Sequence, residues 1–295
     1  MAMVAGYAPR PRWAKCQVPG DCVLSHCTID DTLTQPGSRT LLSQERIDAV
    51  RINAPQDIRR AAEALHEIAL SRGLRAAPTH DIADKRTPVD AEGNVLARDV
   101  FGWAEDERVW WRNSRIALDS PLTTACRFES QPFWVNAKGF HVRQPNAYLA
   151  SIDLTNFESR ALTKAAIVVP VHLPFGQIGA VSFNPLDPAN TDLNEEFLAS
   201  GDALGVYART FISTYLHVMG SLQALPAESR LSKREVECLR WAAIGKTDLE
   251  ISMIIGRSRA TVRFHIHNAS MKLNAVNRSQ TVFKAAQLGY ISLGN

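Results

Sequence analysis

Basic side chains share one face of a predicted helix close to the C-terminus. Arg259, Arg263 and His267 are spaced four residues apart, so on a helix they lie one above the other. Phe264 stands beside them. A helix with positive charge on the face that is not apolar is the pattern of an element that enters the DNA major groove, where its N-terminal half meets base edges.

The opposite face of the same helix must hold it in a core. Val262, Ile266, Ala269 and Leu273 repeat at helical spacing and form an apolar stripe. Gly256 predicts a tight turn ahead of the helix, and Ser258 is in position to cap its first turn. We therefore expect a helix from Ser258 to about residue 273.

Two shorter helices are predicted ahead of it from their capping boxes. Ser232 precedes Glu235 by three residues, and Thr247 precedes Glu250 by the same spacing. Helices over about 233–243 and 248–255 follow from these caps, with a fourth over about 279–288. A short turn between two helices, of which the second is basic on its free face, is the geometry of a helix-turn-helix.

Residues 231–291 resemble the DNA-binding domain of the LuxR-type transcriptional regulators. The matching segments are L-S-x-R-E-x-E-C-L-x-W-x-A-x-G-K-T, E-I-S-x-I-I-G-x-S and T-V-R-F-H-I-x-N-x-x-x-K-L. The resemblance implies that Arg263, Phe264 and His267 read bases. It implies phosphate contacts for Thr261, His265 and Lys272, with Arg259 on the same DNA-facing side, and a dimerising role for the fourth helix.

The charge distribution agrees with this expectation. Residues 229–295 hold eleven Lys or Arg and four Asp or Glu, a formal net charge of +7. The whole chain carries +3, so residues 1–228 carry −4. Positive charge is concentrated in the C-terminal segment, as neutralisation of DNA phosphates requires.

A second cluster of chemically informative residues is aromatic. Four of the six tryptophans fall between positions 103 and 134. An indole buries a large apolar area and brings one N–H donor, which is the mixture that an amphipathic ligand needs; an ordinary aromatic core would give the same density. The aromatic candidates for a ligand site are Trp103, Trp110, Trp111, Phe133 and Trp134.

About residues 100–184 resemble the autoinducer domain of the same family, which binds acyl-homoserine lactones. The matches are Asp119 ahead of Pro121, Pro132-Phe133-Trp134, and Val169-Pro170-Val171-His172 followed by Gly176, Gly179 and Ser182. The resemblance implies that Asp119 accepts the ligand's amide N–H, that Trp134 packs on the lactone ring and that Ser182 meets the acyl carbonyl.

The sequence departs from that family pattern at three positions, one of which is Arg115, four residues before Asp119, where the family usually has an aromatic residue. Ser120 separates Asp119 from Pro121, where the family has the two residues adjacent. Asp106 stands where the family places a tryptophan that donates to the lactone carbonyl, and an ionised carboxylate is only an acceptor. A local gap would bring Trp103 into that donor position instead. An acyl-homoserine lactone is the leading single candidate ligand, with its identity left open.

The order of predicted elements implies an α+β fold, with an α-β-α sandwich ahead of a small all-α domain. A strand pair is expected between Thr79 and Val100, helices over about 105–115 and 121–128, a hairpin over 166–183 and one long helix over 192–219. The predicted organisation is a flexible arm (1–40), a small-molecule sensor domain (41–220), a linker (221–230) and the helix-turn-helix domain (231–295).

Composition excludes several classes of protein. No apolar run reaches the roughly 18 residues that span a bilayer, and no signal peptide is evident. Five cysteines without paired CxxC spacing indicate a reducing cytoplasm. Cys16, Cys22 and Cys27 with His26 fit no zinc pattern and are interpreted as free thiols, so no metal or cofactor is expected.

The sequence therefore predicts a cytoplasmic regulator rather than an enzyme. Its histidines are scattered, and it contains neither a phosphate-binding glycine loop nor a Gly-x-Ser-x-Gly elbow. The expected partners are double-stranded DNA carrying an inverted repeat, a small-molecule signal and a second copy of the chain, with RNA polymerase as a further candidate. The alternative is a ligand-independent regulator whose N-terminal domain dimerises or binds a protein partner.

Overall fold

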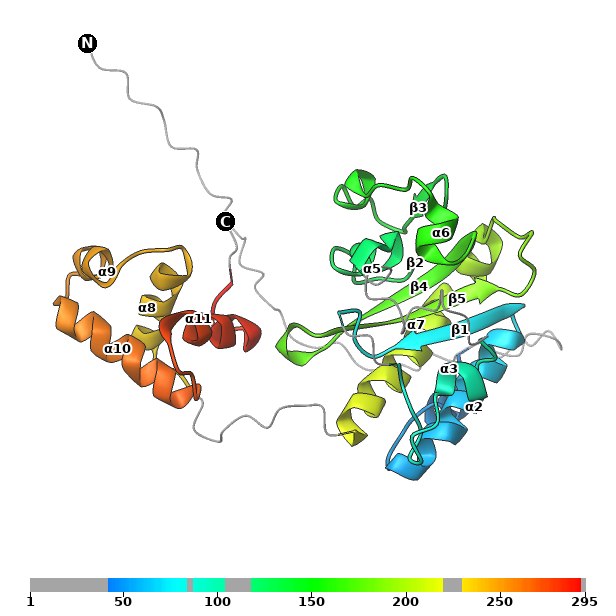
Figure 1. Cartoon of the computed structure of the whole chain (residues 1–295), viewed down its shortest axis with the longest axis horizontal. Coiled ribbons are helices and arrows are strands. Elements are labelled where there is room, and N and C mark those ends of the chain that lie inside the picture. The colour runs from blue at the N-terminus through cyan, green and yellow to red at the C-terminus, as the bar shows by residue number, and fades with distance from the viewer. Residues whose placement is uncertain (1–41, 84–86, 104–117, 220–229, 293–295) are drawn as a thin grey trace, which may run out of the picture. The chain divides into compact units, whose positions relative to one another are not determined.

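The computed structural model describes residues 42–83, 87–103, 118–219 and 230–292. The sequence-predicted arm, the linker and the helix expected over 105–115 lie outside these residues, as do the cysteines and the histidine of the arm. The described elements form a sheet domain (residues 43–219) and a helical domain (residues 231–291) (Figure 1).

An antiparallel sheet is the framework of the sheet domain. Its strand order is β1-β5-β4-β2-β3, and every neighbouring pair is antiparallel. The strands are β1 (Leu74–Thr79), β2 (Phe133–Asn136), β3 (Gly139–His141), β4 (Ala165–His172) and β5 (Ile178–Pro185). β4 and β5 form the predicted hairpin, which the register of His172 with Ile178 confirms.

Helices cover both faces of this sheet. One apolar cluster holds α1 (Gln44–Ala49), α2 (Ile58–Leu70) and α7 (Asn194–Val218) against the sheet, and a second, on the other face, holds α5 (Pro121–Cys126) and α6 (Phe157–Ala161) (Figure 1). The α-β-α sandwich expected from the sequence is therefore confirmed. We call the second face the α5 face.

In the described part of the stretch from Thr79 to Val100, which excludes residues 84–86, the expected pair of strands is not formed. One isolated bridge joins Val89 and Val95 across the predicted turn, and the short helix α3 (Leu96–Asp99) follows. The turn at residues 90–94 is held instead by Asp90, whose buried carboxylate accepts from the Asn94 backbone and side chain at 2.8 and 2.9 Å. On the side away from β4, β5 pairs with β1, which follows α2 after a short turn.

The helical domain consists of α8 (Lys233–Ala243), α9 (Asp248–Ile254), α10 (Arg259–Lys272) and α11 (Arg278–Gln287). Both capping boxes predicted from the sequence are formed, at Ser232 with Glu235 and at Thr247 with Glu250. The Ser258 side chain caps α10 by accepting from the Thr261 backbone N–H at 3.1 Å. These local bonds explain why the predicted and observed helix ends differ by at most one residue here.

A small apolar core joins the four helices. Val262 and Ile266 of α10 pack with Ile251 and Cys238, and Ala269 and Leu273 pack with residues of α8 and α11. α9 and α10 are linked by the turn at Gly256, whose φ of +62° belongs to the left-handed region that glycine adopts without steric cost. The helix-turn-helix geometry predicted from the sequence is confirmed.

Candidate DNA interface and ligand cavity

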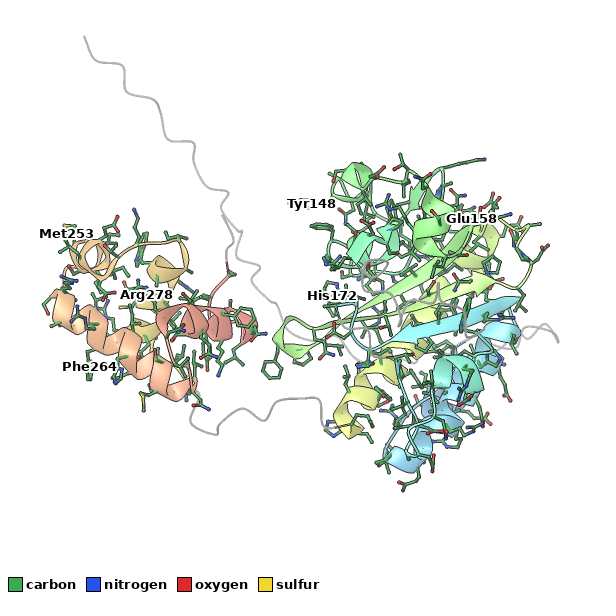
Figure 2. The ribbon with its side chains drawn as sticks, in the orientation of Figure 1. Tyr148, Glu158, His172, Met253, Phe264 and Arg278 are labelled. Atoms are coloured by element: carbon green, nitrogen blue, oxygen red, sulfur yellow. The ribbon has the colours of Figure 1, made fainter. Side chains whose placement is uncertain are left out.

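The exposed face of α10 carries the residues singled out as base readers. Arg259, Arg263 and His267 are exposed, as expected from their spacing, and Phe264 keeps 59% of its area accessible. Figure 2 shows Phe264 on the outer side of α10. A large apolar side chain left on a polar helix face is available for contact with a partner.

Arg263 has a weak contact within its own domain. Its Nε lies 3.8 Å from Asp248 Oδ2, and the side chain remains 67% exposed. Asp248 is already paired with the Arg278 guanidinium, which also donates to the Lys246 carbonyl oxygen at 2.7 Å. The Arg263 guanidinium can therefore move away from Asp248, because the Asp248 carboxylate keeps its ion pair with Arg278.

Lys272, expected to meet a phosphate, is engaged inside the domain. Its Nζ donates to both carboxylate oxygens of Glu235 at 2.9 Å, and the Glu235 side chain is only 4% exposed. The same carboxylate accepts from the Ser232 backbone N–H at 2.7 Å. In the structure the charge of Lys272 thus neutralises a buried capping carboxylate, and its phosphate contact stays a prediction.

The other two expected phosphate contacts lie at the edge of the exposed face. The Thr261 hydroxyl lies 2.9 Å from the Ser258 hydroxyl, and the His265 ring packs edge-on against Phe264 with 5.9 Å between ring centroids. Both residues are half-buried.

The Glu235–Lys272 pair predicts a dependence of stability on pH. Burial alone would raise the pKa of Glu235, but the bonds from Lys272 and Ser232 outweigh it, so the pKa lies below the ordinary 4.5. A carboxyl group whose pKa is lower in the folded state stabilises the fold at pH values above its pKa in the unfolded chain. This stabilisation is lost as the pH falls through the pKa of the folded state.

We therefore expect the helical domain to lose stability as the pH falls below about 4.5. Hydrogen exchange of α8 and α10 in the full chain, followed from pH 6 to pH 3.5 after correction for intrinsic exchange rates, measures this loss. In Glu235→Gln the loss over this interval should be smaller, and an unchanged profile in that variant would assign it to other carboxylates.

The α5 face of the sheet domain contains a cavity of about 150 Å³. Its described lining combines apolar side chains with neutral polar ones and includes no charged residue. The apolar part comes from Leu122, Cys126, Leu162, Val168 and Ala180, and the polar part from Thr79, Thr87, Ser120, Thr123, Ser182 and Asn184. Such a lining suits a small amphipathic molecule.

The structure places Ser182 in this cavity but places Trp134 on the opposite face of the sheet. Ser182 is paired with Val168 and Trp134 with Ile167, and consecutive residues of a strand face opposite sides. Trp134 accordingly belongs to the core under α2 and α7, where it stacks on His141 with 3.7 Å between ring centroids. Its indole N–H is buried and has no hydrogen-bond partner among the residues that the structure describes.

Asp119 does not line the cavity either. Its side chain is exposed, whereas the neighbouring Ser120 is only 1% exposed and faces the cavity. The expectation that Asp119, Trp134 and Ser182 converge on one site is therefore wrong. The physical reason is that neighbouring residues of a strand point to opposite faces of the sheet, so a register that is wrong by one residue puts the side chain on the wrong face. At the start of a helix, neighbouring residues likewise point in different directions.

Ser120, rather than Asp119, has the family's adjacency to the proline. Ser120 directly precedes Pro121, and the position fifteen residues later is Val135, which is buried on the α5 face. Ser120 thus stands where the resemblance expects the carboxylate. Its place next to Pro121 was the signal in the sequence that could have identified it.

Two of the remaining aromatic candidates are described by the structure. Trp103 lines the cavity, but its Nε1 donates to the Ala76 carbonyl oxygen at 2.8 Å, and the Arg75 guanidinium lies 5.3 Å from its ring centroid. Trp103 is therefore not a free donor for a lactone carbonyl. Phe133 is fully buried behind the cavity, on the α5 face. Asp106, Trp110 and Trp111 lie outside the described residues.

Asn184 is a cavity residue that the sequence interpretation missed. It lies two residues after Ser182 on the same strand face, and its Oδ1 accepts from the Ser182 hydroxyl at 3.2 Å. Alternation along β5 could have indicated it once Ser182 was assigned to the cavity.

These features define a helix-turn-helix protein with a cavity-bearing α-β-α domain. The family model of the bacterial regulatory proteins of the luxR family matches residues 229–285. The quorum sensing-dependent transcriptional regulator RpaR of Rhodopseudomonas palustris is 30% identical over 200 residues, which cover 65% of this chain and 74% of RpaR. The chain belongs to the LuxR family of regulators.

Two further similarities were found. The transcriptional activator VanR of Vibrio anguillarum is 35% identical over 133 residues. These residues cover 44% of this chain and 52% of VanR, so the match spans about half of that relative's length. The crystal structure of Escherichia coli SdiA has 22% identity and a TM-score of 0.43, over 84% of this chain and 95% of SdiA. Among the described residues, no helix is both long and apolar enough to cross a membrane.

Proposed function

We propose that this protein is a transcriptional regulator that binds DNA through α10 and a small amphipathic molecule through the cavity on the α5 face. The observation that carries the proposal is the exposed face of α10, where Arg259, Arg263 and His267 surround Phe264 above a packed helix-turn-helix core. No catalytic role is proposed, since the family consists of transcriptional regulators.

The DNA site is proposed to be an inverted repeat bound by two copies of the chain. One helix-turn-helix reads only a half-site, and a symmetric dimer reads two half-sites that are related by the same two-fold axis. The proposed base readers are Arg263, Phe264 and His267, with Arg259, Thr261 and His265 next to them for phosphates. Lys272 is left out because Glu235 holds it.

The small-molecule role rests on the cavity and on its neutral, mostly apolar lining. The relative RpaR is a quorum sensing-dependent regulator, and we extend a signal-dependent role to this chain. Acyl-homoserine lactones remain the first compounds to test, although neither Asp119 nor Trp134 lies where the family roles require.

Selection of DNA by the purified full chain tests the regulator function. From a random 30-base-pair library we expect enrichment of a two-fold symmetric sequence of about 20 base pairs. Its dissociation constant should rise steeply with salt, because each phosphate contact releases counterions. Selection repeated with a panel of acyl-lactones should show tighter binding to the same sequence for at least one compound.

Three results of this selection would separate the parts of the proposal. An asymmetric consensus would remove the dimer, and the absence of any consensus would remove sequence-specific binding. Equal affinity with and without every compound, combined with no compound-induced change in hydrogen exchange of α5 and β5, would favour the ligand-independent alternative.

A further inference from the structure

The polar end of the cavity carries hydrogen-bond donors that the protein itself does not use. The Ser120 Oγ accepts from the Leu122 backbone N–H at 3.3 Å, and none of the described residues accepts its hydroxyl proton. Ser120 is 1% exposed and lines the cavity, so its hydroxyl can donate to a molecule bound there.

Asn184 supplies a second donor from the facing strand. Its Oδ1 accepts from the Ser182 hydroxyl, and no residue in the described part of the chain accepts from its Nδ2, which carries two donors. Asn184 is 8% exposed and lines the same cavity. By contrast, the hydroxyl protons of Thr79 and Thr123 are already donated to the carbonyl oxygens of Asp81 and Ser120.

We infer that Ser120 and Asn184 form a donor subsite that recognises a carbonyl or ether oxygen of a neutral ligand, and that an amide N–H on the ligand is not required. The inference rests on the proposed small-molecule function and specifies the ligand class of the same cavity. A carboxylate at position 120 would accept a charge-assisted bond from an amide N–H, which a neutral hydroxyl does not provide.

The ligand class follows from the rest of the described lining. Leu122, Val168 and Ala180 offer an apolar wall for an alkyl or acyl chain, and no described lining residue is charged. A charged ligand would lose its hydration without a counter-charge there. The described lining therefore suits an uncharged molecule with an apolar chain and an oxygen-rich head, such as an ester, a lactone or a ketone.

Two probes that differ in one atom test the inference on the full chain. They are N-hexanoyl-homoserine lactone and α-hexanoyloxy-γ-butyrolactone, in which an ester oxygen replaces the amide N–H. We expect the wild type to bind the ester at least as tightly as the amide in calorimetric titration. Ser120→Asp keeps the helix cap but replaces the donor with an acceptor, so it should shift the preference about tenfold toward the amide.

Two further variants complete the design. Asn184→Asp removes the second donor and should move the preference in the same direction, which keeps the test decisive if Ser120→Asp fails to fold. Asp119→Asn changes the exposed neighbour of Ser120 and should alter neither dissociation constant by more than about twofold, within the scatter of surface substitutions.

The outcomes separate this inference from the proposed function. A wild type that prefers the amide tenfold, with a preference that neither variant changes, would overturn the donor subsite and leave the small-molecule function standing. If neither probe binds the wild type or Ser120→Asp, the cavity is not a site for acyl-lactone-type ligands; the inference then fails with that part of the proposed function, and DNA binding through α10 is tested separately by the selection experiment.

Discussion

Lys272→Ala is expected to destabilise the helical domain by about 1.5–3 kcal/mol, the range for a buried charged group that loses its hydrogen-bond partner. The Glu235 carboxylate would keep its position under α8, at 4% exposure, without the ammonium that now neutralises it. DNA binding should weaken as well, but only because the folded population of the domain falls.

The stability loss is measured by hydrogen exchange of α8 and α10 in the full chain. Arg240→Ala is the matched control, because it removes one positive charge from an exposed position of α8. It should change stability by less than about 0.5 kcal/mol. The double variant Glu235→Gln/Lys272→Ala should recover part of the lost stability, because it no longer contains the unpaired buried carboxylate of Glu235. If Lys272→Ala leaves exchange unchanged while DNA affinity falls, the phosphate role was right after all.

Arg263→Ala is expected to weaken binding to the selected inverted repeat by about 1–3 kcal/mol per half-site and to relax selectivity at one base position. The side chain is 67% exposed, and its contact with Asp248 at 3.8 Å is too long to hold it strongly. A guanidinium offers two parallel donors that match the acceptors on one guanine edge, and alanine offers none.

Fluorescence anisotropy on the selected sequence and on random DNA measures this effect. Arg263→Ala should lose far more affinity on the selected sequence than on random DNA, whereas Arg240→Ala should affect both by the same small factor. Equal losses on the two DNAs would show that Arg263 contributes charge alone and reads no base.

The helical domain shows how much a sequence can determine when the signals are local. Ser232, Thr247 and Ser258 each bond to a backbone N–H three residues away, so the start of each helix depends on a single turn of chain. The stripe of Val262 and Ile266 fixes the buried face of α10, and the exposed positions of Arg263 and His267 follow from the same period. These features could be derived without knowing any distant contact.

The cavity required the tertiary structure, because its lining depends on strand register. Trp134 and Ser182 face opposite sides of the sheet, and only the pairing of β2 and β5 with β4 decides which side each residue takes. A shift of one residue exchanges Asp119 for Ser120 in the cavity. Spacing within the sequence could not settle this, since side chains alternate every residue along a strand and Trp134 pairs with Ile167, 33 positions further along the chain.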